Sequence, residues 1–286
     1  MADLSSVAQL VLLTKSDDDD DNTNNNDLVL DVNPNGIAVV DNFLGPELIT
    51  AMRQEAESLL PTMVPSQSTK WDEATQSVIA YEKVGVLSTQ IQGGVQGYEQ
   101  SPRLVEYIVT LTTHLTTKLN AMLPDAHKLS TSQQTNKLAV CLGDGSYYDK
   151  HIDNLGGGGG GTTTTPAAAG GGDRRKLTAL LYLQPPGSHD RLPQTFPHER
   201  VEDDDRGGYF RAYDVPEPNH VTCIAPRGDR LVVFWSDALV HDVSPSFAPA
   251  GQADRRWALT TWLVADEQAM IRDTNSVIAQ RHFGTG

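Results

Sequence analysis

Three side chains of this sequence have the types and the spacing of metal ligands. His151 and Asp153 stand two residues apart, and a third candidate, His241, follows much later in the chain. Two imidazoles and one carboxylate occupy one face of an octahedral metal ion and leave three positions open, which is the ligand set of non-haem Fe(II) oxygenases. Residues two apart on an extended segment point to the same side, so one strand end can present both His151 and Asp153. The pattern therefore predicts a metal site with open coordination positions.

The short His-x-Asp pattern also has an ordinary explanation. The chain has 8 His and 37 acidic residues among 286, so about one such pair is expected by chance. His151 and Asp153 would then be a surface pair at a turn, and His241 would be a hydrogen-bonded imidazole of the core. The segments around these residues must decide between the two interpretations.

Apolar runs of strand length surround the candidate ligands. One run, residues 137–142, ends in Gly143-Asp144-Gly145, which is a turn signal. A second run, residues 230–237, breaks at a polar corner and resumes at His241. The sequence thus predicts strands that deliver both parts of the metal site.

Arg256 opens the last apolar run, residues 256–264. Strand alternation places Arg256, Thr260 and Trp262 on one face of this run. A buried guanidinium is costly without a partner, and its planar fork fits a carboxylate. The position suits binding of the far carboxylate of 2-oxoglutarate, and an ion pair with the nearby acid Asp254 is the alternative.

These segments together resemble the hypoxia-inducible-factor type of prolyl 4-hydroxylase, a branch of the Fe(II)/2-oxoglutarate dioxygenases. The resemblance is collinear and runs from about Leu28 to about Glu267. It rests on segments 35–45, 148–154, 177–183, 229–237 and 241–243, on Gly207-Gly208 and on Arg256.

The resemblance implies a fold and a set of cofactors. The expected fold is α+β and mainly β, a double-stranded β-helix (jelly roll) with supporting N-terminal helices. His151, Asp153 and His241 match the iron ligands of the family. The implied cofactors are Fe(II), 2-oxoglutarate as co-substrate, O2 and ascorbate.

Further site residues follow from the same resemblance. Positions that bind 2-oxoglutarate in the family are matched by Arg256, Tyr182 and Thr260. Candidate residues of the substrate pocket are Trp262, Arg175 and Tyr81. For Tyr182 the alternative is an ordinary aromatic residue of a strand.

The implied reaction is hydroxylation of a prolyl residue at C4 in a protein substrate, and such an enzyme is a candidate oxygen sensor. Two alternatives stay open. One is a 2-oxoglutarate oxygenase that acts on another residue or on a small molecule, and the other is a non-catalytic jelly-roll binding module. The complete ligand triad and Arg256 argue against the non-catalytic module, because a decayed site usually loses a ligand.

One departure from the family lies inside the expected co-substrate pocket. Where the family usually has a Tyr, two residues before the Gly-x-Gly turn, this chain has Cys141. The exchange removes a hydroxyl group and side-chain volume. Tyr147 and Tyr148 are the nearby residues that can replace it.

Composition restricts the partners and the compartment. The net charge of -15 at pH 7 argues against nucleic acid or anionic lipid as a partner, and no apolar run has the length of a membrane-spanning helix. The only cysteines, Cys141 and Cys223, form no disulfide framework. We therefore expect a cytoplasmic or nuclear monomer whose partner is a protein substrate with a target proline.

Composition also suggests the domain limits. We expect a disordered acidic leader over residues 1–27, a dioxygenase domain over 28–267, and a C-terminal tail or helix over 268–286. Low-complexity insertions interrupt the domain near 156–172 and 184–206. The Gly tract of the first insertion lacks the Lys-Ser/Thr of a P-loop, which favours a linker-like insertion.

Two amphipathic helices are predicted before the metal-binding strands, one from Pro46 to Leu59 and one from Pro102 to Met122. Their apolar stripes indicate core-facing supports. The polar segment 66–77 between them is expected to be a loop. It matches in position the loop that closes over substrate in the family, and a connector without function is the alternative.

Overall fold

The structure is a computed structural model that describes residues 36–72, 77–154, 172–185, 194–197, 206–213, 221–249, 251 and 255–271. The expected leader 1–27 lies outside these residues. So do most of the expected insertions 156–172 and 184–206, and residues 272–286 of the expected C-terminal segment.

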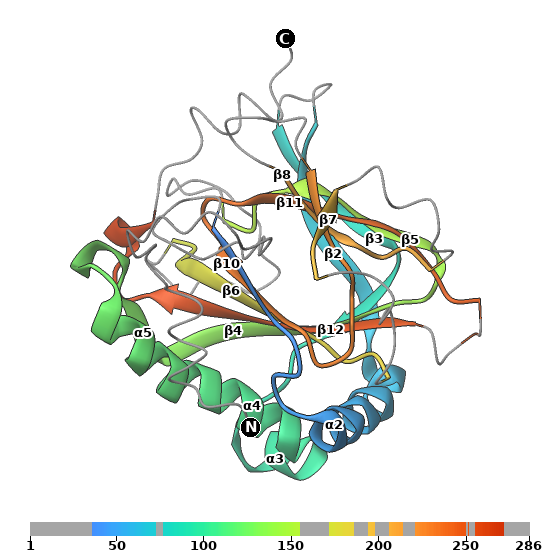
Figure 1. Cartoon of the computed structure of the whole chain (residues 1–286), viewed down its shortest axis with the longest axis horizontal. Helices are drawn as coiled ribbons and strands as arrows, with labels where there is room; N and C mark the ends of the chain where they lie inside the picture. Colours follow the sequence, from blue (N-terminus) through green and yellow to red (C-terminus); the bar gives the residue numbers. More distant parts are fainter. Residues whose placement is uncertain are drawn as a thin grey trace, which may run out of the picture.

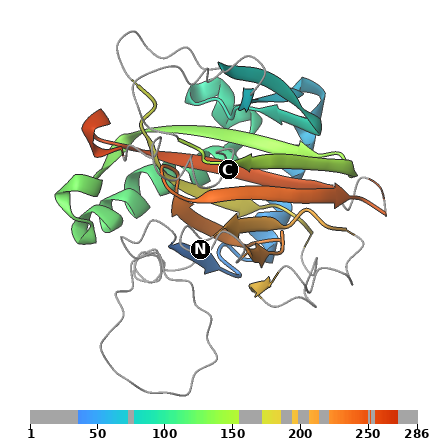
Figure 2. The ribbon, with the colours of Figure 1, turned by 90° about the horizontal axis from the view of Figure 1, so that it is seen from above.

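Two antiparallel sheets make up most of the described chain (Figure 1). The larger sheet contains, in spatial order, β1 (Ile37–Val40), β10 (Leu231–Trp235), β6 (Arg175–Tyr182), β12 (Arg256–Ala265), β4 (Leu129–Cys141), β3 (Ser77–Thr89) and β2 (Val64–Asp72). The smaller sheet contains β5 (Asp144–His151), β11 (Val240–Phe247), β8 (Phe210–Tyr213), β9 (Val221–Ile224) and β7 (Phe196–Pro197). Figure 2 shows the long strands lying side by side. The expected mainly β jelly roll is confirmed.

The two faces of the larger sheet have different neighbours, and β12 illustrates this. Trp257, Leu259 and Leu263 belong to the core that the sheet shares with the helices. Ala258, on the opposite face, packs in a second core with Phe210 of the smaller sheet. Strand alternation therefore puts Arg256, Thr260 and Trp262 on the face that looks into the barrel, as the sequence predicts.

Helices gather along the outer side of the larger sheet (Figure 1). They are α2 (Pro46–Ser58), α3 (Gly94–Gln100), α4 (Pro102–Thr110), a π-helical turn (Leu111–Leu115) and α5 (Thr116–Met122). Both predicted helical regions are confirmed, although a π-turn interrupts the second. Helix α3 was not predicted, because its Val95 is 77% exposed and it has no apolar stripe. No helix among the described residues is long and apolar enough to span a membrane.

The segment 66–77 was expected to be a loop, and this prediction is wrong for most of its length. Residues 64–72 form β2, and their register with β3 runs from Val64 opposite Ser88 to Asp72 opposite Ser77. Only Val86–Thr89 of β3 also pair with β4, so the hairpin continues past the larger sheet. A hairpin without a neighbour on its outer edge can carry polar residues, and no apolar alternation then signals the strands.

Asp229 ties the start of α2 to the loop before β10. Its carboxylate accepts hydrogen bonds from the backbone N–H groups of Leu44 and Gly45, each at 2.7 Å. Its own backbone has φ 63, a left-handed conformation that Asp tolerates better than most residues. The carboxylate thereby satisfies two N–H groups at a helix start that has no side-chain cap of its own.

We expect Asp229→Asn to lower the free energy of unfolding by about 1–3 kcal/mol, because one N–H group loses its acceptor and faces an amide donor instead. Asn keeps the tolerance for the left-handed backbone, so the change isolates the carboxylate. Urea unfolding measures the effect. Glu47→Gln, an exposed acid in the first turn of the same helix, is the control and should shift stability by less than about 0.5 kcal/mol. Equal effects of the two changes would contradict this role for Asp229.

Candidate metal centre and co-substrate pocket

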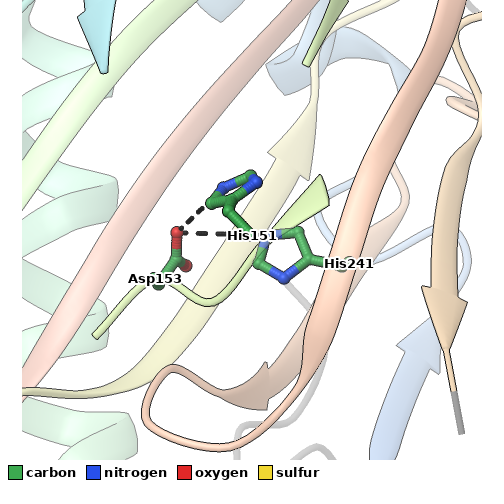
Figure 3. A group of neighbouring side chains, drawn as sticks. All are labelled: His151, Asp153 and His241. Carbon is green, nitrogen blue, oxygen red and sulfur yellow. Dashed lines mark ion pairs between the residues drawn. The ribbon is translucent and has the colours of Figure 1, made fainter. Parts of the chain in front are cut away.

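The structure brings His151, Asp153 and His241 together between the two sheets (Figure 3). His151 is the last residue of β5, and His241 lies opposite it in the register of β11 with β5. One ligand atom from each of the three residues lies within 4.8 Å of the others. Oδ1 of Asp153 is 3.6 Å from Nε2 of His151 and 3.9 Å from Nε2 of His241.

Backbone carbonyls orient both imidazoles. Nδ1 of His151 lies 2.7 Å from the carbonyl oxygen of Asp149, and Nδ1 of His241 lies 3.1 Å from that of Leu239. A carbonyl oxygen only accepts, so Nδ1 must carry the proton in each ring. Each Nε2 is left with its lone pair directed toward Asp153, as a metal ligand requires.

The carboxylate of Asp153 uses its two oxygens for different purposes. Oδ2 accepts a hydrogen bond from Oγ1 of Thr178 at 2.7 Å and another from Nε1 of Trp262 at 3.0 Å. Oδ1 faces the two imidazoles. Burial alone would raise the pKa of Asp153, but His151 and His241 hold it well below its usual value. The group is therefore an ionised carboxylate with one oxygen available to a metal.

His241 is enclosed by aromatic rings. The ring of Phe210 stacks on it at 5.0 Å between centroids, and Phe234 meets it edge-on at 4.8 Å. Burial disfavours the imidazolium and, with the neighbouring His151, lowers the pKa of His241 to about 4. The ring is consequently neutral at physiological pH, which is the form that binds metal.

This donor set fits Fe(II). Among the described residues, His151, Asp153 and His241 are the group of His, Cys, Asp or Glu residues with the proximity to hold an ion. They offer two imidazole nitrogens and one carboxylate oxygen that converge on one point. A metal held on one side by three ligands keeps positions free for other molecules.

Arg256 lies on the inner face of the larger sheet, in the strand that also carries Trp262. Its Nε donates to the carbonyl oxygen of Gly208 at 2.9 Å, and its guanidinium donates to the hydroxyl of Tyr182 at 3.3 Å. Arg256 is 4% exposed, and no carboxylate pairs with it among the described residues. Asp254, the alternative partner expected from the sequence, lies outside them.

Gly208 is needed for this contact. Its φ is +72, and a Cβ atom there would lie 3.0 Å from Cδ of Arg256. Any other residue would therefore strain the backbone and press on the arginine side chain.

The other predicted site residues differ in their distance from the triad. Thr260 lies opposite Lys137 and Leu180 in the sheet register, on the inner face. The guanidinium of Arg175 stacks on Trp262 at 5.2 Å, close to the metal-binding carboxylate. The hydroxyl of Tyr81 hydrogen-bonds with Ser68 and with Asp149, which lies two residues before His151.

Two residues of the site were missed by the sequence analysis. Thr178 is the hydroxyl that holds Asp153, and it stands alone in the apolar run of β6; its place four residues before Tyr182, on the same face, was the available signal. Lys83 is a buried ammonium of the pocket, and nothing in the alternation of β3 indicates its direction. Near Cys141, Tyr148 packs against the thiol, whereas Tyr147 is 41% exposed.

We expect the metal-free protein to lose stability as the pH falls from about 6.5 to about 4. The pKa of His241 is about 4 in the folded state and about 6.5 in an unfolded chain. Between these values the unfolded chain binds the additional proton, so the free energy of unfolding falls with falling pH.

Urea unfolding at several pH values tests this by comparing the wild type with His241→Gln. The variant should show the shallower dependence, since it lacks the imidazole whose pKa the fold lowers. His114→Gln is the same change at an exposed helix position and should keep the wild-type slope. Parallel curves for the wild type and His241→Gln would contradict the neutral, buried imidazole.

Comparison with known proteins is consistent with this geometry. Residues 136–264 match the 2OG-Fe(II) oxygenase superfamily. Egl nine homolog 1 of Homo sapiens is 27% identical over 246 residues, which cover 84% of this chain and 47% of the relative. The corresponding protein of Rattus norvegicus is 26% identical over 246 residues, with 84% and 59% covered. The chain thus spans about half the length of the curated relatives it matches.

Solved structures share the fold. A prolyl hydroxylase from Trichoplax adhaerens, in complex with a peptide fragment of the hypoxia-inducible-factor oxygen degradation domain, aligns with a TM-score of 0.59 and 23% identity, covering 93% of this chain and 92% of that one. A prolyl-4-hydroxylase from Pseudomonas putida aligns with a TM-score of 0.53 and 21% identity, covering 80% and 93%. The segment that matches the 2OG-Fe(II) oxygenase superfamily, residues 136–264, carries the triad and Arg256 on a jelly roll.

Proposed function

We propose that this protein is an Fe(II)- and 2-oxoglutarate-dependent dioxygenase that hydroxylates a prolyl residue at C4 in a protein substrate. The observation that carries the proposal is the pairing of two features in one barrel. At one place three ligands converge with their free atoms directed at a common point, and on the same inner face a buried arginine has no anionic partner among the described residues. The relatives named as prolyl hydroxylases support the choice of proline.

His151, Asp153 and His241 would bind Fe(II) through two Nε2 atoms and Oδ1. Bound iron supplies activation of O2 coupled to oxidative decarboxylation of 2-oxoglutarate. The protein's own contribution is to fix the ligands. Thr178 and Trp262 keep Oδ2 of Asp153 occupied, so the carboxylate presents a single oxygen to the ion.

Arg256 would bind the far carboxylate of 2-oxoglutarate. Its pKa lies above the usual value: burial opposes this, but the polar groups of Tyr182, Cys141 and Tyr148 outweigh the effect. The guanidinium thus stays charged in a pocket from which water is excluded, where its attraction for a carboxylate is strong. The hydroxyl of Tyr182 accepts a hydrogen bond from Arg256 and would donate its own proton to the same carboxylate of 2-oxoglutarate. Thr260 would lie beside that carboxylate.

Trp262 and Arg175 would form the substrate side of the pocket. The indole N–H of Trp262 is fixed on Asp153, and Arg175 covers its ring while pairing with Asp173. Tyr81, on the β2–β3 hairpin, stays a candidate contact for the substrate protein farther from the metal. Oxygen sensing, use of ascorbate, a monomeric state and a cytoplasmic or nuclear location likewise stay predictions.

We expect Asp153→Ala to abolish both iron retention and 2-oxoglutarate turnover, because two imidazoles alone hold Fe(II) weakly. Iron content by metal analysis and succinate release measure the two effects. Asp125→Ala, at a fully exposed carboxylate, is the control and should match the wild type. Succinate release by Asp153→Ala at the wild-type rate would refute the assignment.

The choice of proline is tested with the wild-type enzyme on proline-containing proteins. Mass spectrometry should locate the added oxygen on prolyl C4, in an iron- and 2-oxoglutarate-dependent manner. Oxygen incorporated at another residue or into a small molecule would keep the dioxygenase and refute the prolyl substrate.

We expect Thr178→Val to weaken Fe(II) binding by about 10–100-fold, because Asp153 loses one of the two donors that orient it. The shape of the side chain is kept, although the buried hydroxyl of Ser236 also loses its hydrogen bond with Thr178, so thermal unfolding of the variant checks that it is folded. Thr261→Val is a matched control: Thr261 is also fully buried, and its hydroxyl has no hydrogen-bond partner among the described residues. If both variants bind Fe(II) alike, the hydroxyl of Thr178 does not orient the ligand.

A further inference from the structure

We propose that Lys83 is a second cationic anchor for the far carboxylate of 2-oxoglutarate, acting beside Arg256. The inference rests on the proposed 2-oxoglutarate dependence and extends it to a residue outside the ligand-bearing strands. It also accounts for the hydroxyl group that is missing at Cys141.

A break in β3 turns Lys83 into the barrel. Lys83 is 7% exposed and Val86 is 1% exposed, although these residues are three apart, while Val84 between them is 59% exposed. Strict alternation would put Lys83 and Val86 on opposite faces. The alternation shifts at Gly85, whose φ is +65 and where a Cβ atom would lie 2.2 Å from Oδ1 of Asp144. Only glycine fits there, so the backbone at Gly85 sets the direction of the lysine.

Lys83 and Arg256 approach from strands on either side of Cys141. In the larger sheet, Cys141 of β4 pairs with Arg256 of β12 on one side and with Val86 of β3 on the other. Val86 packs with Cys141 in one small cluster, to which Tyr148 adds its ring. Cys141 therefore lies between the strand of the arginine and the strand that carries the lysine.

The ring of Tyr148 lies against both cations. Nζ of Lys83 is 3.6 Å from the ring centroid, and the guanidinium carbon of Arg256 is 5.9 Å from it. A cation over an aromatic ring gains part of the energy of an ion pair but leaves its N–H donors unused. Tyr148 thus contacts both cationic side chains without using any of their N–H donors.

No protein anion compensates this pair of charges among the described residues. Lys83 makes no hydrogen bond or ion pair there, and Arg256 donates to the carbonyl oxygen of Gly208, the hydroxyl of Tyr182 and the thiol of Cys141, none of which is a carboxylate. The one carboxylate that acts on Lys83 is Asp153, which belongs to the metal. Burial, Lys137 and Arg256 lower the pKa of Lys83 well below its usual value.

Two other fully buried cations of the same fold are paired with carboxylates. Nζ of Lys176, fully buried, lies 2.7 Å from the fully buried carboxylate of Asp237. The fully buried Arg230 lies 2.6 Å from Asp41. An unpaired buried charge is strongly destabilising, so a chain that pairs its structural charges and leaves Lys83 and Arg256 unpaired has a pocket made for an anion.

A carboxylate can satisfy both residues at once. Its two oxygens offer about four lone-pair sites, enough for the fork of Arg256 and for one N–H of Lys83. The near end of 2-oxoglutarate is expected at the metal, which leaves the far carboxylate for the cationic end of the pocket. Lys83 would then supply the donor that a tyrosine hydroxyl supplies in the family.

The test measures ligand binding by titration calorimetry on protein loaded with Mn(II), which binds without turnover. Lys83→Met keeps the length of the side chain and removes only the charge and the donors. We expect it to weaken 2-oxoglutarate binding by about tenfold or more, the worth of one charge-assisted hydrogen bond. Lys118→Met, the same change at an exposed position of α5, should bind 2-oxoglutarate as the wild type does.

A second ligand identifies the carboxylate concerned. 2-Oxopentanoate keeps the keto acid end and lacks the far carboxylate, and its weaker binding can be followed by displacement at millimolar concentration. Lys83→Met should bind 2-oxopentanoate with the wild-type affinity. Equal losses for both ligands would overturn the proposal, as would unchanged affinity for 2-oxoglutarate.

Thermal unfolding separates this role from a structural one. Without ligand, Lys83→Met should unfold at the wild-type temperature or above it, because a buried polar group without a hydrogen-bond partner has been removed. 2-Oxoglutarate should then stabilise the wild type more than the variant. A variant that is less stable without ligand and equally stabilised by it would show that Lys83 supports the fold only, and Lys83→Gln repeats the test if the methionine variant does not fold.

Failure of this inference is distinguishable from failure of the proposed function. If the wild type binds Mn(II) and 2-oxoglutarate and releases succinate with Fe(II), while Lys83→Met binds 2-oxoglutarate equally well, only the role of Lys83 is refuted. If the wild type binds no 2-oxoglutarate, both proposals fail.

Discussion

The hydrogen bonds to Oδ2 of Asp153 connect the two sheets at the point where the metal ligands meet. The donors, Thr178 and Trp262, come from β6 and β12 of the larger sheet, whereas His151 and His241 come from β5 and β11 of the smaller one. Asp153 lies two residues after the end of β5 and connects the two sheets through these hydrogen bonds. The separation and register of the sheets therefore decide whether three ligand atoms converge. Packing that fixes the sheets, such as that of Phe210 on Phe234 across the barrel, is therefore part of the site, and both rings also contact His241.

The two faces of the larger sheet have different roles: the outer face packs against the helices, and the inner face carries residues of the candidate site. The outer face is covered by helices that share one continuous apolar core with it. Arg53 and Glu55 show how α2 is tied in: Arg53 reaches the carbonyl oxygen of Leu183 beyond β6, and Glu55 accepts from the backbone at the start of α4. With its outer face fixed in this way, the sheet can carry polar and charged residues on its inner face without losing its shape.

The sequence pointed to the triad because apolar runs, which form the end of β4 and all of β10, come directly before the segments that carry His151 and His241. Alternation along β12 also placed Arg256 and Trp262 on one face. It did not reveal Lys83, because the direction of that residue depends on a left-handed backbone at Gly85 that breaks the alternation. The β2–β3 hairpin was mistaken for a loop, since its backbone pairing has no counterpart in an apolar pattern. The contribution of Thr178 depends on the register of β6 with β12, which no single segment of sequence contains.

The fixed orientation of the Asp153 carboxylate also affects which metal ions the site can bind. Because Oδ2 accepts hydrogen bonds from two donors, the carboxylate of Asp153 cannot rotate to coordinate an ion with both oxygens. Ca²⁺ prefers roughly six to eight oxygen ligands and flexible, often bidentate carboxylates, and Mg²⁺ also favours oxygen over nitrogen. A rigid centre with two imidazole nitrogens and one oxygen offers these abundant hard cations a poor environment. The hydroxyl of Thr178 and the indole of Trp262 thus contribute to selectivity against these cations, although neither group would coordinate the metal.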